Sequence, residues 1–318
     1  MRVRLLAAVM PVAAALLASA GVSACGVMPG AASAVYGSGS AANGAIVAIG
    51  AENEYADVIG AVGGKYVTAS AIMSNPNTDP HAFEASPKVA QQVSAAQLVV
   101  QNGLGYDAFM KTIENAAPDG SRRVIVVQDL LGLPDSTPNP HLWYKPGTMT
   151  AVATAVAGEL AAIQPGHAAY FRANAARFAS SLAAWTAALD SFKTKFRDTP
   201  VATTEPVADY MLQAAGARNL TPFAFQQDIM NGTDPSAQDV ATERSLLTGH
   251  KVRALVYNQQ VTDSLTESFI NLAQASGIAV VGVYETMPAP GYDYRSWMVA
   301  EVQALAKAVA SNTSTEHL

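Results

Sequence analysis

The chain has 318 residues, half of them hydrophobic, and a formal net charge of −6 with a pI of about 5.3. The acidic balance, with no cluster of Lys and Arg, argues against nucleic acid as a partner. A single cysteine leaves no basis for an internal disulfide or a Cys-ligated zinc site.

Residues 1–24 are predicted to be a lipoprotein signal peptide. Two arginines near the start precede an apolar, Ala- and Leu-rich stretch of signal-peptide length. The residues Val22-Ser23-Ala24-Cys25 that follow resemble a bacterial lipobox, in which the cysteine is lipidated and becomes the mature N-terminus. Cys25 is therefore the predicted lipidation site. A plain secretory signal is the alternative, and a membrane-spanning anchor is disfavoured because the stretch is short and contains Pro11.

Residues 25–44 are rich in Gly, Ala and Ser, contain no charge, and are predicted to be a flexible tether. A lipid anchor, a spacer and a large body predict an exported lipoprotein on the extracytoplasmic face of the cell membrane.

The body begins with a region, residues 45–163, in which short apolar runs alternate with helical patterns. Helical patterns such as Glu54–Val62 and Pro87–Ala96 separate the runs. The predicted strands are Ile46–Ile49, Tyr66–Ala69, Leu98–Gln101 and Val124–Val127. This alternation is typical of βαβ units and predicts an α/β lobe with a mainly parallel sheet.

A second series of the same kind occupies residues 200–310, followed by a polar tail over 311–318. Helical patterns such as Pro206–Ala215 and Leu265–Ala275 again separate the runs. The predicted strands are Pro200–Thr204, Val252–Asn258 and Ile278–Tyr284. We therefore expect two α/β lobes of similar size with a ligand cleft between them.

The strongest helical pattern, within residues 164–199, lies between the two lobes. From Phe171 to Phe196 the large apolar residues recur at spacings of three, four and seven, which places them on one helical face. A helix from about Pro165 to Phe196 would span roughly 48 Å at about 1.5 Å per residue, enough to join both lobes as a rigid connector. The alternative is a helix packed within one lobe.

Four candidate metal ligands follow predicted strands. His81 and His141 stand in the similar settings Asp79-Pro80-His81 and Asn139-Pro140-His141, and Glu205 and Glu285 follow strands of the second lobe. Open α/β sheets bind ligands at the carboxyl ends of their strands, and imidazole is a common metal ligand. The sequence thus predicts a metal site with two ligands from each lobe. Glu205 has an alternative role as an N-terminal charge of the helix that begins at Pro206.

Several segments resemble one known family. Asp79-Pro80-His81-Ala82-Phe83-Glu84 resembles the DPHxxE stretch, and Pro140-His141-Leu142-Trp143 the PHxW stretch, of the metal-binding receptors of zinc and manganese ABC importers, also called cluster A-I. Asn102-Gly103-Leu104-Gly105 and Asp234-Pro235-Ser236 resemble further motifs of that family, and the similarity extends over about residues 45–308.

The resemblance implies a receptor with two lobes joined by a rigid helix. Such a receptor passes its metal to a membrane permease. The resemblance also implies that His81, His141, Glu205 and Glu285 hold the ion. In the family the fourth ligand is usually an aspartate, so Glu285 departs from the pattern. A glutamate as the third ligand, Glu205, favours manganese, whereas the imidazoles of His81 and His141 suit zinc. The sequence therefore leaves both Zn²⁺ and Mn²⁺ as candidate ions.

Two other functions stay open at this point. A metal-dependent hydrolase needs an open coordination position, which four protein ligands would close, and the chain contains no HExxH, GxSxG or P-loop motif. The other is an adhesin or structural lipoprotein whose metal only stabilises the fold.

Overall fold

The structure is a computed structural model and describes residues 44–77 and 79–318. The predicted signal peptide, the lipidation site Cys25 and the predicted tether up to residue 43 lie outside the described residues. Within the described part of the chain, no helix is both long and apolar enough to cross a bilayer. All described residues belong to one compact unit.

The first half of the chain forms a four-stranded parallel sheet in the order β2-β1-β3-β4. The strands are β1 (Ile46–Glu52), β2 (Val67–Met73), β3 (Leu98–Gln101) and β4 (Arg123–Val126). Strand β1 is central, because its Ala48 pairs with Ala69 of β2 on one side and with Leu98 of β3 on the other. The predicted strands and their parallel arrangement are confirmed.

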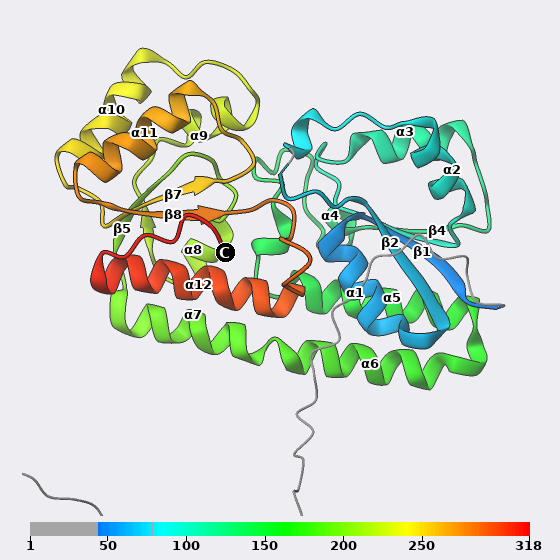
Figure 1. Cartoon of the computed structure of the whole chain (residues 1–318). Coiled ribbons are helices and arrows are strands. Elements are labelled where there is room, and N and C mark those ends of the chain that lie inside the picture. The colour runs from blue at the N-terminus through cyan, green and yellow to red at the C-terminus, as the bar shows by residue number, and fades with distance from the viewer. Residues whose placement is uncertain (1–43, 78) are drawn as a thin grey trace, which may run out of the picture. The chain divides into compact units, whose positions relative to one another are not determined.

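Helices cover both faces of this sheet, so that the central strands are apolar on both sides. Ala48 packs in one cluster with α1 and α5, whereas its neighbour Ile49 packs in another with α2 and α3. Figure 1 shows these two layers on opposite sides of the strands. The helices are α1 (Asn53–Gly63), α2 (Pro87–Ala95), α3 (Ala108–Ala116), α4 (Val127–Leu130) and α5 (Thr148–Ile163), with short 3₁₀ helices η1 (Gly64–Tyr66), η2 (Pro80–Ala82) and η3 (Leu142–Tyr144).

The second half repeats this arrangement with a parallel sheet in the order β6-β5-β7-β8. The strands are β5 (Pro200–Thr203), β6 (Arg218–Asn219), β7 (Ala254–Asn258) and β8 (Ala279–Val283). The helices are α8 (Asp209–Ala214), α9 (Phe223–Met230), α10 (Ala237–Thr248), α11 (Ser264–Ala275) and α12 (Tyr294–Ser311). The two-residue strand β6 was not predicted. Beyond α12, Thr315 pairs in parallel with β8 and covers part of its open edge.

The predicted connecting helix is present but bent. It consists of η4 (Pro165–His167), α6 (Ala168–Ser181) and α7 (Ala183–Phe196). At the break, the Leu182 amide bonds the Ala179 carbonyl at 3.2 Å, and the Ser181 hydroxyl bonds the Phe178 carbonyl at 2.6 Å. Such local hydroxyl bonds and short turns bend helices.

The two parts of the bent helix pack against different halves of the chain. α6 lies against α1 and α5, and α7 lies against α12 and α8. The alternative of a helix packed within one lobe is therefore wrong. We call the first sheet with its helices the N-terminal lobe and the second the C-terminal lobe.

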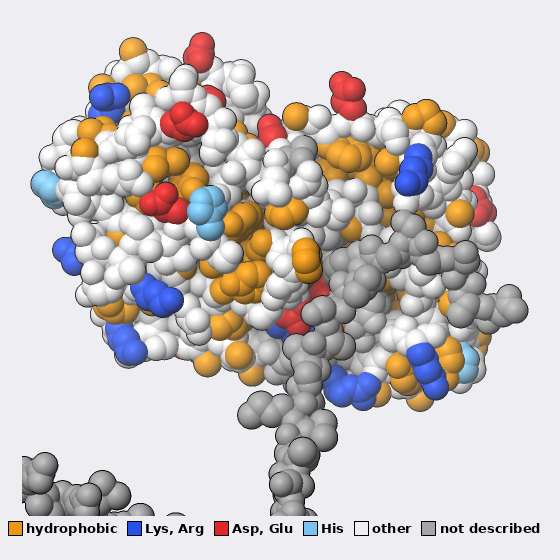
Figure 2. All heavy atoms as spheres, in the orientation of Figure 1, with side chains coloured by type: hydrophobic (Ala, Val, Ile, Leu, Met, Phe, Trp, Pro, Cys, Tyr) orange, Lys and Arg blue, Asp and Glu red, His pale blue; other side chains and the backbone are white. Residues whose placement is uncertain are grey.

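The two lobes share one apolar core. A single cluster of buried residues includes Val62 of α1 together with Trp297 of α12. Hydrogen bonds reinforce this contact, since the Tyr294 hydroxyl donates to the Trp143 carbonyl at 2.6 Å and the Tyr294 amide to Asp57 at 3.2 Å. On the molecular surface, charged side chains are dispersed rather than clustered over the face shown in Figure 2.

Candidate metal centre

The two Asx-Pro-His segments adopt the same local structure. The Asp79 side chain accepts a hydrogen bond from the His81 amide at 2.8 Å, and the Asn139 side chain accepts one from the His141 amide at 3.0 Å. A short Asp or Asn side chain that bonds the backbone two residues on forms an Asx turn, and the intervening proline fixes the backbone between them. The repeated sequence therefore builds two similar turns, and each presents an imidazole.

The turns lie beyond the carboxyl ends of strands. His81 lies in η2, which follows β2, and His141 directly precedes η3, beyond β4 and α4. His141 is fully buried, whereas 24% of the His81 side chain is exposed. His81 is thus the part of the candidate site in contact with solvent.

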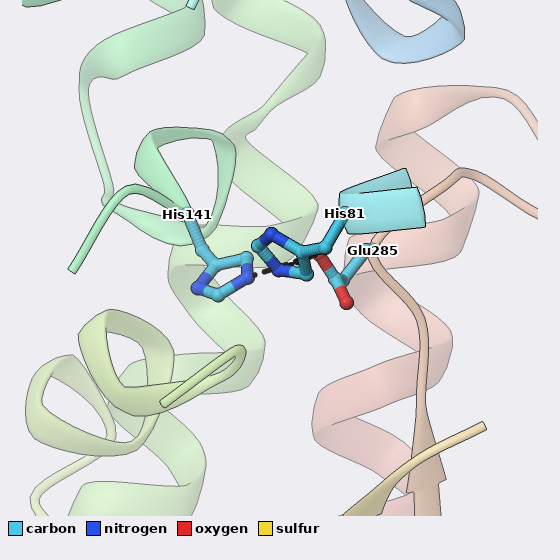
Figure 3. A group of neighbouring side chains, drawn as sticks. All are labelled: His81, His141 and Glu285. Atoms are coloured by element: carbon cyan, nitrogen blue, oxygen red, sulfur yellow. Dashed lines mark hydrogen bonds and ion pairs between the residues drawn. The ribbon is translucent and has the colours of Figure 1, made fainter. Parts of the chain in front are cut away.

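Both imidazoles point at one carboxylate oxygen. The Nε2 atoms of His81 and His141 each lie 3.2 Å from Oε2 of Glu285, which directly follows Tyr284 beyond β8 (Figure 3). The ligand atoms of these three side chains all lie within 4.8 Å of one another. The structure thus brings together two ligands predicted from the N-terminal lobe and one from the C-terminal lobe.

Asn139 sets the tautomer of His141. Its Oδ1 lies 2.8 Å from His141 Nδ1 and can act only as an acceptor, so Nδ1 carries the proton. In the neutral ring, Nε2 then directs a lone pair at Oε2 of Glu285. Two lone pairs at this distance need a cation between them, either a proton or a metal ion.

Glu205 lies beside this group rather than in it. It follows β5, is only 3% exposed, and shares a hydrogen-bond donor with Glu285: Nδ2 of Asn258 donates to Oε1 of Glu205 at 3.1 Å and to Oε1 of Glu285 at 2.6 Å. The other oxygen of Glu205, Oε2, is buried without a hydrogen-bond partner among the described residues. A buried carboxylate oxygen without a partner is costly unless a cation neutralises it.

The pKa values of the two carboxylates move in opposite directions. Burial raises the pKa of Glu205 well above its usual value, and the charge of Glu285 raises it further. Burial also acts to raise the pKa of Glu285, but the adjacent imidazoles of His141 and His81 outweigh it and hold that pKa well below its usual range. Glu285 is therefore the more readily ionised of the two carboxyl groups.

The two imidazoles also differ in pKa. Burial lowers the pKa of His141, and Glu285 only partly offsets this effect. Burial also acts to lower the pKa of His81, but the hydrogen bond and charge of Glu285 outweigh it and raise that pKa. His81 is therefore the imidazole that binds a proton more readily when no metal ion is present.

Sequence reasoning missed two polar residues at the centre of the group. The Tyr106 hydroxyl donates to Oε2 of Glu285 at 2.9 Å, and Asn258 links the two glutamates. Tyr106 directly follows the quoted Asn102–Gly105 segment, and Asn258 is the last residue of β7. A search for polar residues at every predicted strand end would have found Asn258.

Residues 51–308 match the sequence profile of one protein family, described as zinc-uptake complex component A, periplasmic (ZnuA). The chain belongs to this family. ZnuA-family proteins are solute-binding proteins, and the chain is accordingly a metal-binding component of an ABC importer rather than an enzyme. This assignment gives no support to the hydrolase alternative.

Individual relatives are distant in sequence but similar in fold. The manganese-binding lipoprotein MntA of Bacillus subtilis (strain 168) is 21% identical over 243 residues, which cover 72% of this chain and 76% of MntA. A crystal structure of ZnuA has a TM-score of 0.68 at 21% identity and covers 84% of this chain and all of its own. A manganese-bound periplasmic metal-binding protein from Candidatus Liberibacter asiaticus has a TM-score of 0.67 at 18% identity and covers 83% of this chain and 99% of its own. These structures share the two-lobed α/β fold.

Proposed function

We propose that His81, His141, Glu205 and Glu285 bind one Zn²⁺ or Mn²⁺ ion, which the protein captures outside the cytoplasm and delivers to the permease of an ABC importer. The observation that carries this proposal is the convergence of two imidazole Nε2 atoms on one buried carboxylate oxygen. The partnerless Oε2 of Glu205 supports a fourth ligand.

The relatives support a divalent cation without selecting one. The family description refers to zinc, MntA is named for manganese, and the Liberibacter protein has been solved with manganese and with cadmium. Two imidazoles and two carboxylates offer donors suited to both zinc and manganese.

The proposed location follows from the same comparisons. The family description is periplasmic, and MntA is named a lipoprotein. We infer that a lipid on Cys25 anchors the protein to the membrane and that residues 25–44 tether the body close to its permease.

Competitive metal titration of the purified protein tests the ligand set. The wild type is expected to bind one ion. Metal affinity should fall by more than the 10- to 100-fold typical of outer-sphere changes in each of four variants: His81→Ala, His141→Ala, Glu205→Gln and Glu285→Gln. Exposed residues outside the group supply matched controls, His317→Ala and Glu267→Gln, which should bind as the wild type does. Unchanged binding in Glu205→Gln would remove Glu205 from the site.

A further inference from the structure

The side chain of Asn258 bonds both candidate glutamates. It is 1% exposed at the end of β7, and each hydrogen of its Nδ2 group has a carboxylate acceptor, Oε1 of Glu205 or Oε1 of Glu285. A primary amide has two such hydrogens. Both donors of Asn258 are thus used on the two carboxylates.

The orientation of this amide is set by its other end. Oδ1 of Asn258 accepts a hydrogen bond from the Gln260 amide at 3.0 Å, so Nδ2 must face the carboxylates. Gln260 in turn accepts hydrogen bonds from the Glu285 and Thr286 amides with its Oε1, both at 2.7 Å. The segment after β7 therefore fixes both the backbone and the carboxylate of Glu285.

This arrangement leaves one oxygen of each carboxylate for a metal ion. Oε2 of Glu285 faces the two imidazoles and accepts a hydrogen bond from the Tyr106 hydroxyl, and Oε2 of Glu205 is buried without a partner among the described residues. Because Asn258 bonds Oε1 of each glutamate, it competes with an ion for that oxygen and so disfavours binding through both oxygens of either carboxylate. The protein then supplies four donor atoms, two nitrogens and two oxygens.

We propose that Asn258 is a positioning residue that determines metal specificity, because it keeps Glu205 and Glu285 monodentate and so favours Zn²⁺ over Mn²⁺. Zinc in closed protein sites is almost always four-coordinate, whereas manganese favours six-coordinate sites rich in oxygen. The proposal rests on the proposed function, since it assumes that the ion binds between these side chains.

The test compares the wild type with Asn258→Ala and Asn258→Leu. Leucine keeps a similar volume but has no donor. Asn174→Ala is the matched control, because Asn174 is a buried asparagine that bonds the Val62 carbonyl. Competitive titration gives the ratio of Zn²⁺ to Mn²⁺ affinity, and X-ray absorption at the metal edge gives the coordination number. The second readout would not change if Asn258 only stabilised the fold.

We expect the wild type to hold Zn²⁺ with four donors, and both Asn258 variants to lower the Zn²⁺ to Mn²⁺ affinity ratio by about 10-fold or more. Their coordination number should rise as Oε1 becomes free to bind, and Asn174→Ala should match the wild type. An unchanged affinity ratio and coordination number in both variants would overturn the role of Asn258 alone. If neither variant folds, the coordination number of zinc in the wild type still tests the proposal. Five or more donors around the ion would overturn the role of Asn258. A wild type that binds no metal would overturn the proposed function as well.

Discussion

Nε2 of His141 lies 3.2 Å from Oε2 of Glu285, although the two residues are 144 positions apart and belong to different lobes. Neither atom is exposed to solvent, and the proton on Nδ1 is held by Asn139. The contact therefore joins an imidazole lone pair to a buried negative charge. A cation bound at this point would neutralise the carboxylate and link the two lobes.

The first prediction concerns Asn139. Asn139→Ala removes the acceptor for Nδ1 of His141, so that the ring can rotate and adopt the other tautomer. We expect metal affinity to fall by roughly 10- to 100-fold, as is typical when an outer-sphere partner of a histidine ligand is lost. Asn139→Asp keeps the acceptor for Nδ1, although it loses the 2.7 Å hydrogen bond from Nδ2 to the Pro206 carbonyl, and should therefore lose less affinity than Asn139→Ala in the same titration. Equal losses in both variants would contradict this role of the Asn139 oxygen.

The second prediction concerns the pH dependence of metal binding. Glu285 raises the pKa of His81 in the metal-free protein, so protons compete with the ion for this imidazole at a higher pH than they would for a free one. Affinity should therefore fall as pH is lowered, by up to about 10-fold per pH unit for each proton displaced. Isothermal titration in buffers of different ionisation enthalpy would count the protons released. An affinity that stays constant from about pH 8 to pH 5 would contradict competition at a histidine.

The third prediction concerns stability and a buried acid of α12. Burial raises the pKa of Glu301 to about 8, although its Oε1 accepts hydrogen bonds from Trp297 at 2.8 Å and from Tyr144 at 3.2 Å. The folded protein therefore holds this group neutral, while the unfolded chain ionises it near its usual value of 4.5. The contribution of Glu301 to the free energy of unfolding is therefore fully present below pH 4.5 and is lost as pH rises through about 8.

Denaturant unfolding of the metal-free protein measures this effect. The free energy of unfolding should decrease by up to about 1.4 kcal/mol per pH unit across that window because of Glu301. Glu301→Gln keeps an oxygen acceptor without the ionisation and should have a flatter pH profile. An identical slope in the variant would show that other groups cause the dependence.

The fourth prediction separates a receptor from a protein that needs its metal to fold. Because the lobes share a core that includes Val62 and Trp297, the metal-free protein should remain folded after chelation. Its circular dichroism should be unchanged, and it should rebind one equivalent of Mn²⁺ or Zn²⁺. Loss of helical signal on chelation would favour the structural role that the sequence left open.

Much of the fold was predictable because it depends on local patterns. Short β-branched runs such as Leu98–Gln101 are buried on both faces, and their alternation with helices specifies a parallel sheet. The positions of His81, His141, Glu205 and Glu285 beyond strand ends were likewise predictable from sequence order.

What could not be predicted depends on contacts between distant segments. The hydrogen bonds of Asn258 to Glu205 and Glu285 arise only once β5, β7 and β8 lie side by side. The break at Leu182, where the amide bonds the Ala179 carbonyl three residues back, leaves the apolar periodicity unchanged and so could not be found from it. The contact of Tyr106 with Glu285 likewise requires both lobes to be folded.

We propose that one divalent ion is held between the lobes by two imidazoles and two carboxylates. The most direct test is anomalous diffraction from crystals of the protein loaded with Zn²⁺ or with Mn²⁺. We expect a single strong peak in contact with Nε2 of His81 and His141 and with Oε2 of Glu205 and Glu285. A peak elsewhere, or an ion at this position that Glu205 does not contact, would contradict it.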